Sequence, residues 1–163
     1  MGKINKGRVL LGGLLAGLVI NIIEFVVHQA ILGDQWREAV AALNLQPWSR
    51  VEFVVWAVMM FLVGIFIVWL YAAIRPRYGA GPKTAVLAGL AVWFIYALLG
   101  WGPAFYTIFP CGLVGTTVVI CLVECVVAAL AGGWVYKEEE KEAPARSAEP
   151  VVPTEPAGPT ELP

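Results

Sequence analysis

Four apolar stretches, separated by short polar connections, make up most of the chain. They cover residues 9–32, 51–74, 84–101 and 111–136. Each approaches or exceeds the roughly 20 apolar residues that a helix needs to cross a bilayer, and none shows the alternating pattern of a membrane β-barrel. The pattern predicts an all-α, polytopic membrane protein with four transmembrane helices.

The first connection is longer than a turn and has a pattern of its own. Trp36, Val40 and Leu43 recur at helical spacing within residues 33–50. This spacing predicts a short helix over about 35–44 that lies in the outer membrane interface. An ordinary loop anchored by its tryptophans is the alternative.

Lys and Arg gather on one side of the four spans. They are Lys3, Lys6 and Arg8 before the first span, Arg75, Arg77 and Lys83 in the second connection, and Lys137, Lys141 and Arg146 after the last span. The first connection balances its two arginines with acids, and the third carries no charge. Because cytoplasmic connections carry the excess of Lys and Arg, both termini are predicted to be cytoplasmic.

The C-terminal residues 137–163 differ from the rest of the chain in composition. They hold six of the eleven prolines and seven of the twelve acidic residues, with few apolar side chains to form a core. The chain is therefore predicted to consist of a four-helix transmembrane domain, 1–136, and a disordered, acidic, Pro-rich cytoplasmic tail.

Composition agrees with membrane embedding and excludes several classes of protein. Apolar residues make up 60% and charged residues 14%, with a mean hydropathy of +0.77, so the lipid bilayer is the expected environment. The net charge of −1 combines +3 over residues 1–136 (eight basic, five acidic) with −4 over 137–163 (three basic, seven acidic). Neither part has the footprint of a nucleic-acid-binding protein. No metalloprotease, P-loop, nucleophile-elbow or kinase motif is present, so enzymatic activity is not expected.

The two halves of the chain resemble each other. With an offset of 72, Ala16-Gly17-Leu18 aligns with Ala88-Gly89-Leu90, and with an offset of 65, Trp69-Leu70-Tyr71 aligns with Trp134-Val135-Tyr136. A duplication of two spans would give tandem parallel repeats related by an axis along the membrane normal. Chance matches between apolar sequences are the alternative.

Ionisable residues inside the first and last spans are the strongest functional signal. Each costs roughly 2.5–3.5 kcal/mol at bilayer depth, so it needs a partner or a task. In the first span, Asn21, Glu24 and the only histidine, His28, share one helical face with Gly13 and Gly17. Small residues four apart also allow close helix approach.

The last span repeats this design with Thr117, Cys121, Glu124 and Cys125. We expect the two stripes to face each other and to form a polar pocket in the outer half of the bundle. The predicted site for a substrate or proton consists of Asn21, Glu24, His28, Thr117 and Glu124.

Three interpretations of this pocket stay open. In the first, a protonated Glu24 exchanges hydrogen bonds with its neighbours and fixes helix register in a non-catalytic membrane subunit or scaffold. In the second, Glu24, His28 and Glu124 handle a small solute, ion or proton. Four spans are few for a carrier, so the second interpretation calls for a homo-oligomer or a membrane protein partner.

The third interpretation is a membrane metal site. Cys121 and Cys125 lie one turn apart, and the offset of 65 places Met59 and Met60 of the second span at their depth. Together with His28, these soft ligands suit Cu(I), whereas the carboxylates suit a harder ion. The sequence indicates no particular cofactor. Three cysteines, two of them within a span, do not make a disulfide framework.

The first span and the connection after it resemble small four-span bacterial membrane proteins of unknown function. The resemblance rests on Ala16-Gly17-Leu18, Gly33-x-x-Trp36 and Ala41-Ala42-Leu43, and covers about residues 8–136. It implies a bacterial inner-membrane location and carries no activity.

Overall fold

The computed structural model describes residues 4–138, and this part of the chain folds as helices joined by short connections. The elements are α1 (Lys6–Val26), the π-helical turn η1 (Val27–Ile31), α2 (Gly33–Ala42), α3 (Arg50–Tyr78), α4 (Pro82–Gly100), α5 (Gly102–Phe105) and α6 (Cys111–Val135). Four segments are long and apolar enough to cross a membrane: Lys6–Ile31, Arg50–Tyr78, Pro82–Phe105 and Cys111–Val135. The prediction of an all-α chain with four membrane-spanning helices is confirmed. The predicted tail lies outside the described residues, apart from its first two.

Local sequence explains where the helices begin and how the tight turn between two of them forms. Asn5 caps the start of α1, and Ser49 forms a capping box with Glu52 at the start of α3. Between α3 and α4, Gly79 and Gly81 have φ angles of 85° and 133°. Side-chain-bearing residues rarely adopt these angles, so the two glycines allow the chain to reverse direction within three residues.

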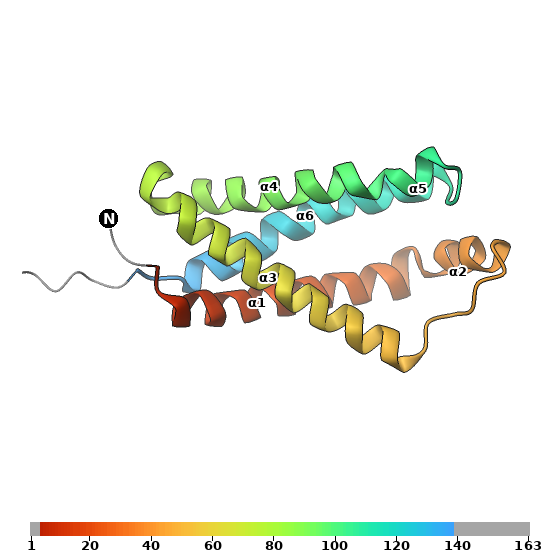
Figure 1. The fold of residues 1–163 in the computed structure, drawn as a ribbon, viewed down its shortest axis with the longest axis horizontal. Helices are drawn as coiled ribbons and strands as arrows, with labels where there is room; N and C mark the ends of the chain where they lie inside the picture. The colour runs from red at the N-terminus through yellow and green to blue at the C-terminus, as the bar shows by residue number, and fades with distance from the viewer. Residues whose placement is uncertain (1–3, 139–163) are drawn as a thin grey trace, which may run out of the picture.

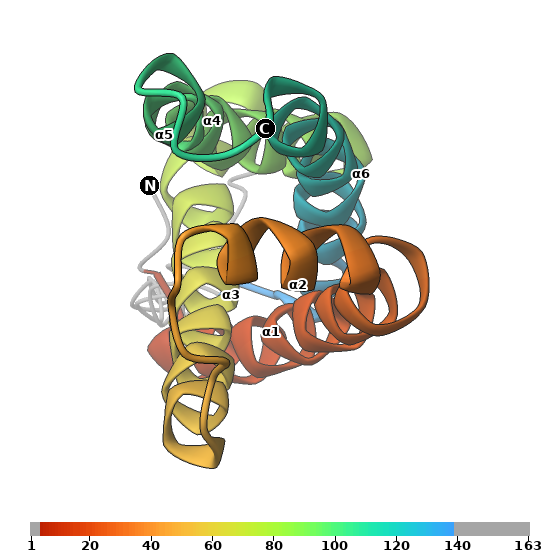
Figure 2. The ribbon, with the colours of Figure 1, turned by 90° about the vertical axis from the view of Figure 1, so that its right-hand side faces the viewer.

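The four long helices form an up-down bundle (Figure 1). Helix α1 packs against α3 and α6, helix α4 packs against the same two helices, and α3 also contacts α6. Seen from the α2 end, α1 and α4 therefore lie diagonally opposite each other (Figure 2). At one end, called the basic end below, α1 and α4 begin while α3 and α6 end. The opposite end carries α2 and α5, and we call it the α2 end.

The half of the bundle near the basic end is tightly packed. A Cβ atom on Gly64 of α3 would lie 2.3 Å from the backbone nitrogen of Gly17 on α1, and one on Gly132 of α6 would lie 2.7 Å from the carbonyl oxygen of Gly12. Small residues four apart in membrane helices allow backbones to approach each other this closely. The buried core here consists of Val9, Ala16, Ile20, Ile67, Val68, Tyr71, Ala72, Ala85, Ala88, Ala128, Ala129 and Tyr136.

Helix α3 diverges from the bundle towards the α2 end, as Figure 1 shows. Its buried residues begin at Gly64, so residues 50–63 contribute none. In the most apolar 18-residue window, 17% of α3 is buried, against 50% of α6. Helix α6 is therefore the most buried of the four spanning helices, and we call it the central helix; Thr117 and Glu124 are its buried polar side chains.

Helix α2 closes over the α2 ends of α1 and α6. Its Trp36 ring packs 6.0 Å from the ring of His28 and 5.1 Å from the ring of Phe109. Beneath it, Val27, Leu32 and Leu113 form a small buried cluster. Helix α2 occupies the region where the sequence predicts a short helix; its position in the membrane interface stays a prediction.

Candidate functional site

Glu24 and His28 lie one turn apart near the end of the first spanning segment. Nε2 of His28 lies 3.1 Å from Oε2 of Glu24, the distance of an ion pair when the imidazole is protonated. The His28 side chain is 33% exposed and that of Glu24 is 17% exposed. His28 also belongs to the π-helical turn, where helices often carry functional residues. The pair thus joins a partly exposed titratable group to a more buried one.

Glu124 lies opposite this pair on the central helix α6. It is only 3% exposed, and its carboxyl group interacts with that of Glu24 across the α1–α6 interface. The Cys121 thiol, one turn away, also interacts with Glu124. The structure thus places Glu24 beside His28 and within electrostatic range of Glu124.

Tyr96 of α4 is a member of this group that sequence reasoning missed. Its phenol interacts electrostatically with Glu24, Glu124 and Cys121. A tyrosine among apolar residues of a span is easily interpreted as an interface anchor. The signal that could have found it is the offset of 72, which aligns Tyr96 with Glu24.

Unpaired polar atoms concentrate at this site. Among residues 4–138, four buried side-chain polar atoms have no hydrogen-bond partner. Three are here: Oε2 of Glu24, Nε1 of Trp36 and Oε1 of Glu124. The contact from His28 to Glu24 has the distance of an ion pair but not the geometry of a hydrogen bond. Most buried polar atoms in proteins have a hydrogen-bond partner, so these atoms carry hydrogen-bonding capacity that the packing leaves unused.

Asn21 and Thr117, which the sequence assigns to the site, hydrogen-bond elsewhere. Nδ2 of Asn21 donates to the carbonyl oxygens of Gly17 at 2.8 Å and of Ala57 on α3 at 3.3 Å. Oγ1 of Thr117 donates to the carbonyl oxygen of Leu113 at 3.0 Å, one turn back on its own helix. The polar groups of both side chains therefore have partners among backbone carbonyl oxygens.

The prediction that the whole polar stripe of the first span faces the last span is wrong. Gly13 and Gly17 approach Ile65 and Phe61 of α3, and Asn21 bonds to α3 as well. Helix α1 contacts both α3 and α6, so residues of one stripe can meet different neighbours at different depths of the bundle.

The soft ligands of the metal interpretation are dispersed. The Sγ atoms of Cys121 and Cys125 are 3.8 Å apart. Met59 is 51% exposed and lines a surface hollow with Trp48, whereas Met60 packs against the core near the basic end. Within residues 4–138, no group of three or more His, Cys, Asp or Glu side chains is arranged to hold a metal ion. The geometry therefore gives a metal site no support.

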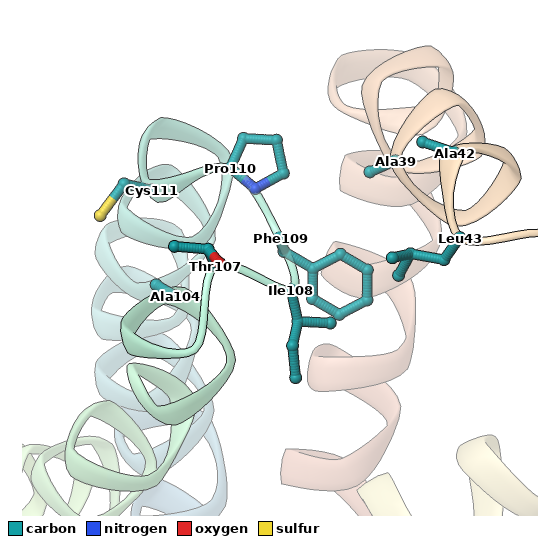
Figure 3. A pocket seen from close by; sticks show the side chains of 9 residues that line it. All are labelled: Ala39, Ala42, Leu43, Ala104, Thr107, Ile108, Phe109, Pro110 and Cys111. Atoms are coloured by element: carbon teal, nitrogen blue, oxygen red, sulfur yellow. The ribbon is translucent and has the colours of Figure 1, made fainter.

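Two surface hollows lie away from the carboxyl pair. The larger, of about 510 Å³, lies between α2 and the connection from α5 to α6 (Figure 3). It is lined by Ala39, Ala42, Leu43, Ala104, Thr107, Ile108, Phe109, Pro110 and Cys111, none of them an acid, a base or a histidine. The other, of about 310 Å³, lies along the diverging part of α3. Glu24, His28 and Glu124 line neither hollow.

Comparison with known proteins adds no relative to this picture. No protein-family model, curated protein or solved structure matches the chain. The resemblance to small four-span bacterial proteins stays a prediction, and the interpretation of the site rests on its geometry.

Proposed function

We propose that the protein is an integral membrane protein that exchanges protons at the Glu24–Glu124 pair. The observation that carries this proposal is the Glu124 carboxyl group, which is buried in the central helix, faces a second carboxyl group and has an oxygen without a hydrogen-bond partner. Of the solute, ion and proton alternatives, the proton fits best because it needs neither a cavity nor a complete ligand shell.

Electrostatics gives each residue a role in this exchange. Two carboxyl groups that face each other in a medium of low dielectric constant do not both ionise easily, so the pair shares a proton. His28, which is partly exposed and contacts Glu24, passes protons between that carboxyl group and the α2 end. The Tyr96 phenol lies within electrostatic range of both carboxyl groups and is the nearby polar group on α4.

Proton flux into vesicles tests this function. The purified protein is reconstituted into liposomes that contain a pH-sensitive dye, and a potassium diffusion potential drives protons inwards. We expect the wild-type protein to acidify the lumen, and Glu24→Gln and Glu124→Gln each to slow acidification by about tenfold or more, because an amide does not titrate.

Thr116→Val is the matched control, since Thr116 lies on α6, is exposed and bonds only to the carbonyl oxygen of Gly112 in its own helix. Its flux should equal that of the wild type. Acidification at the rate of protein-free liposomes, or equal rates for the wild type and both Gln variants, contradicts proton exchange.

We also propose that both termini are cytoplasmic and that the membrane is the bacterial inner membrane. The support is the clustering of Lys and Arg at the basic end, where α1 and α4 begin and where α3 and α6 end. In intact cells, a cysteine introduced by Arg77→Cys in a cysteine-free variant should resist a membrane-impermeant maleimide and react only after lysis. A cysteine introduced by Glu38→Cys on α2 should react at once. Reaction of the Arg77→Cys variant in intact cells contradicts the orientation.

A tandem repeat of two helices is a further part of the proposal, and two pairs of contacts support it. Gly17 of α1 approaches Gly64 of α3, and the residues aligned with them, Gly89 of α4 and Ala129 of α6, also approach each other. The aligned tyrosines behave alike as well. The Tyr71 hydroxyl accepts a hydrogen bond from the backbone nitrogen at the N-cap of α4, and the Tyr136 hydroxyl accepts one from the N-cap of α1.

The partners of the protein follow from the same reasoning. Four apolar helices imply the lipid bilayer as the surrounding medium. The homo-oligomer or membrane protein partner stays a prediction. In the alternative of a non-catalytic membrane subunit, Glu124 holds the helices in register, and its loss destabilises the protein.

A further inference from the structure

The basic end carries an excess of positive charge that the fold does not use. Lys6, Arg8, Arg75, Arg77, Lys83 and Lys137 all lie here, and we call these six residues the basic end surface. All except Arg75 are exposed. Among the described residues, Glu138 is the only acid at this end, so the surface carries five uncompensated positive charges.

Two helix starts add to this positive potential. Helices α1 and α4 both begin at the basic end, and neither has an acidic residue in its first turn. The first turn of a helix carries a partial positive charge, so Lys6 and Lys83 are placed where a cation destabilises the helix by a few tenths of a kcal/mol. An anionic group bound at this surface would relieve both unfavourable placements.

The chain that follows α6 already turns towards this surface. Oε1 of Glu138 lies 3.7 Å from Nη1 of Arg75, and the Arg75 guanidinium lies 5.6 Å from the centroid of the Tyr136 ring. The Tyr136 hydroxyl accepts a hydrogen bond from the backbone nitrogen of Asn5 at 3.4 Å. The first acid after the last helix thus pairs with a residue of the basic end surface.

We propose that the acidic segment 139–163 docks on the basic end surface. This segment carries six glutamates and two basic residues, a net charge of −4 against the five uncompensated positive charges. It leaves the fold at Glu138, which is paired with Arg75. Even with random-coil statistics, 25 residues reach about 25–30 Å, which is enough to cross the end of a bundle whose neighbouring helices are about 8–10 Å apart.

Tethering makes the docking favourable although each contact is weak. A single exposed ion pair contributes little, but a segment attached beside its binding surface has an effective concentration in the millimolar range. Because the contacts are exposed, salt should weaken them. The docked segment would occupy the cations that anionic lipid headgroups would otherwise contact.

Lysine reactivity in the full chain tests the docking. Brief acylation with an amine-reactive ester in a neutral detergent, followed by mass spectrometry, reports the accessibility of Lys6 and Lys83. In the triple variant Glu139→Gln, Glu140→Gln and Glu142→Gln, we expect both lysines to react about fivefold faster, because the loss of three charges releases the segment. High salt should have a similar effect on the wild-type chain.

The matched control replaces the same three glutamates with aspartate, which keeps the charge and should keep the protection. Unchanged reactivity of Lys6 and Lys83 in the glutamine variant overturns the proposal. The same measurement in nanodiscs of zwitterionic or anionic lipid identifies the other occupant. Protection that requires anionic lipid and does not depend on the three glutamates assigns the surface to lipid headgroups and also overturns the proposal. Neither outcome depends on proton flux, so the test is independent of the proposed function.

Discussion

Gly64→Ala is expected to lower the free energy of unfolding by about 3 kcal/mol, the upper part of the range for overpacked cores. The added methyl group would lie 2.3 Å from the nitrogen and 2.6 Å from the Cα atom of Gly17, and 2.6 Å from the carbonyl oxygen of Gly13. All three are backbone atoms and cannot rotate away as a side chain can. Helices α1 and α3 must therefore separate, and the dispersion contacts along their interface weaken.

The measurement is reversible unfolding in mixed micelles, followed by tryptophan fluorescence. Gly112→Ala is the matched control, because a Cβ atom on this exposed α6 glycine meets nothing within 4 Å. Alanine also restricts the unfolded chain and favours the helix, so the control should be about 0.5–1 kcal/mol more stable than the wild type. Equal stabilities of the two variants would show that the α1–α3 backbones do not touch at Gly64.

Glu124→Leu is expected to stabilise the protein by about 1–2 kcal/mol while it abolishes proton exchange. The substitution removes a buried carboxyl group that has an unpaired oxygen and faces a second carboxyl group. Leucine has a similar volume and costs nothing to bury. Glu24 keeps its contact with the partly exposed His28, so the variant leaves no new buried charge without a partner.

This stability measurement separates the two main interpretations of the site. If Glu124 held the helices in register as part of a scaffold, its loss would destabilise the protein instead. Ile120→Leu, one turn away on α6 and partly buried, is the control for a change of side-chain shape alone and should alter the stability by less than about 1.5 kcal/mol. A Glu124→Leu variant less stable than this control contradicts a functional carboxyl group and supports the scaffold.

The sequence predicted the spanning segments well because insertion into a bilayer depends on length and hydropathy, which are local properties. The predicted stretch 111–136 and helix α6 at Cys111–Val135 differ by one residue, whereas α3 at Arg50–Tyr78 extends four residues beyond the predicted stretch 51–74. Hydropathy did not predict the two short elements that depend on local backbone geometry. The π-helical turn Val27–Ile31 and the short helix α5 have no hydropathy signature, and the structure alone identified them.

The choice of helix face was harder to predict, for a physical reason. In water, hydrophobic burial marks the inner face of a helix, but in lipid both faces of a spanning helix are apolar, and packing is decided by shape and by a few polar groups. The glycines of α1 could therefore have met either neighbour. Only the tertiary structure placed Gly17 against α3 and Glu24 against α6.

The sequence by itself determined the number of spans and identified Glu24, His28 and Glu124 as the costly residues within them, because both depend on local chemistry. The tertiary structure decided that Glu124 is buried, that Tyr96 joins the carboxyl pair and that Asn21 does not. The surroundings of these three side chains depend on which helix is central and on how α3 diverges from the bundle. Both features are set by close contacts between residues far apart in the chain.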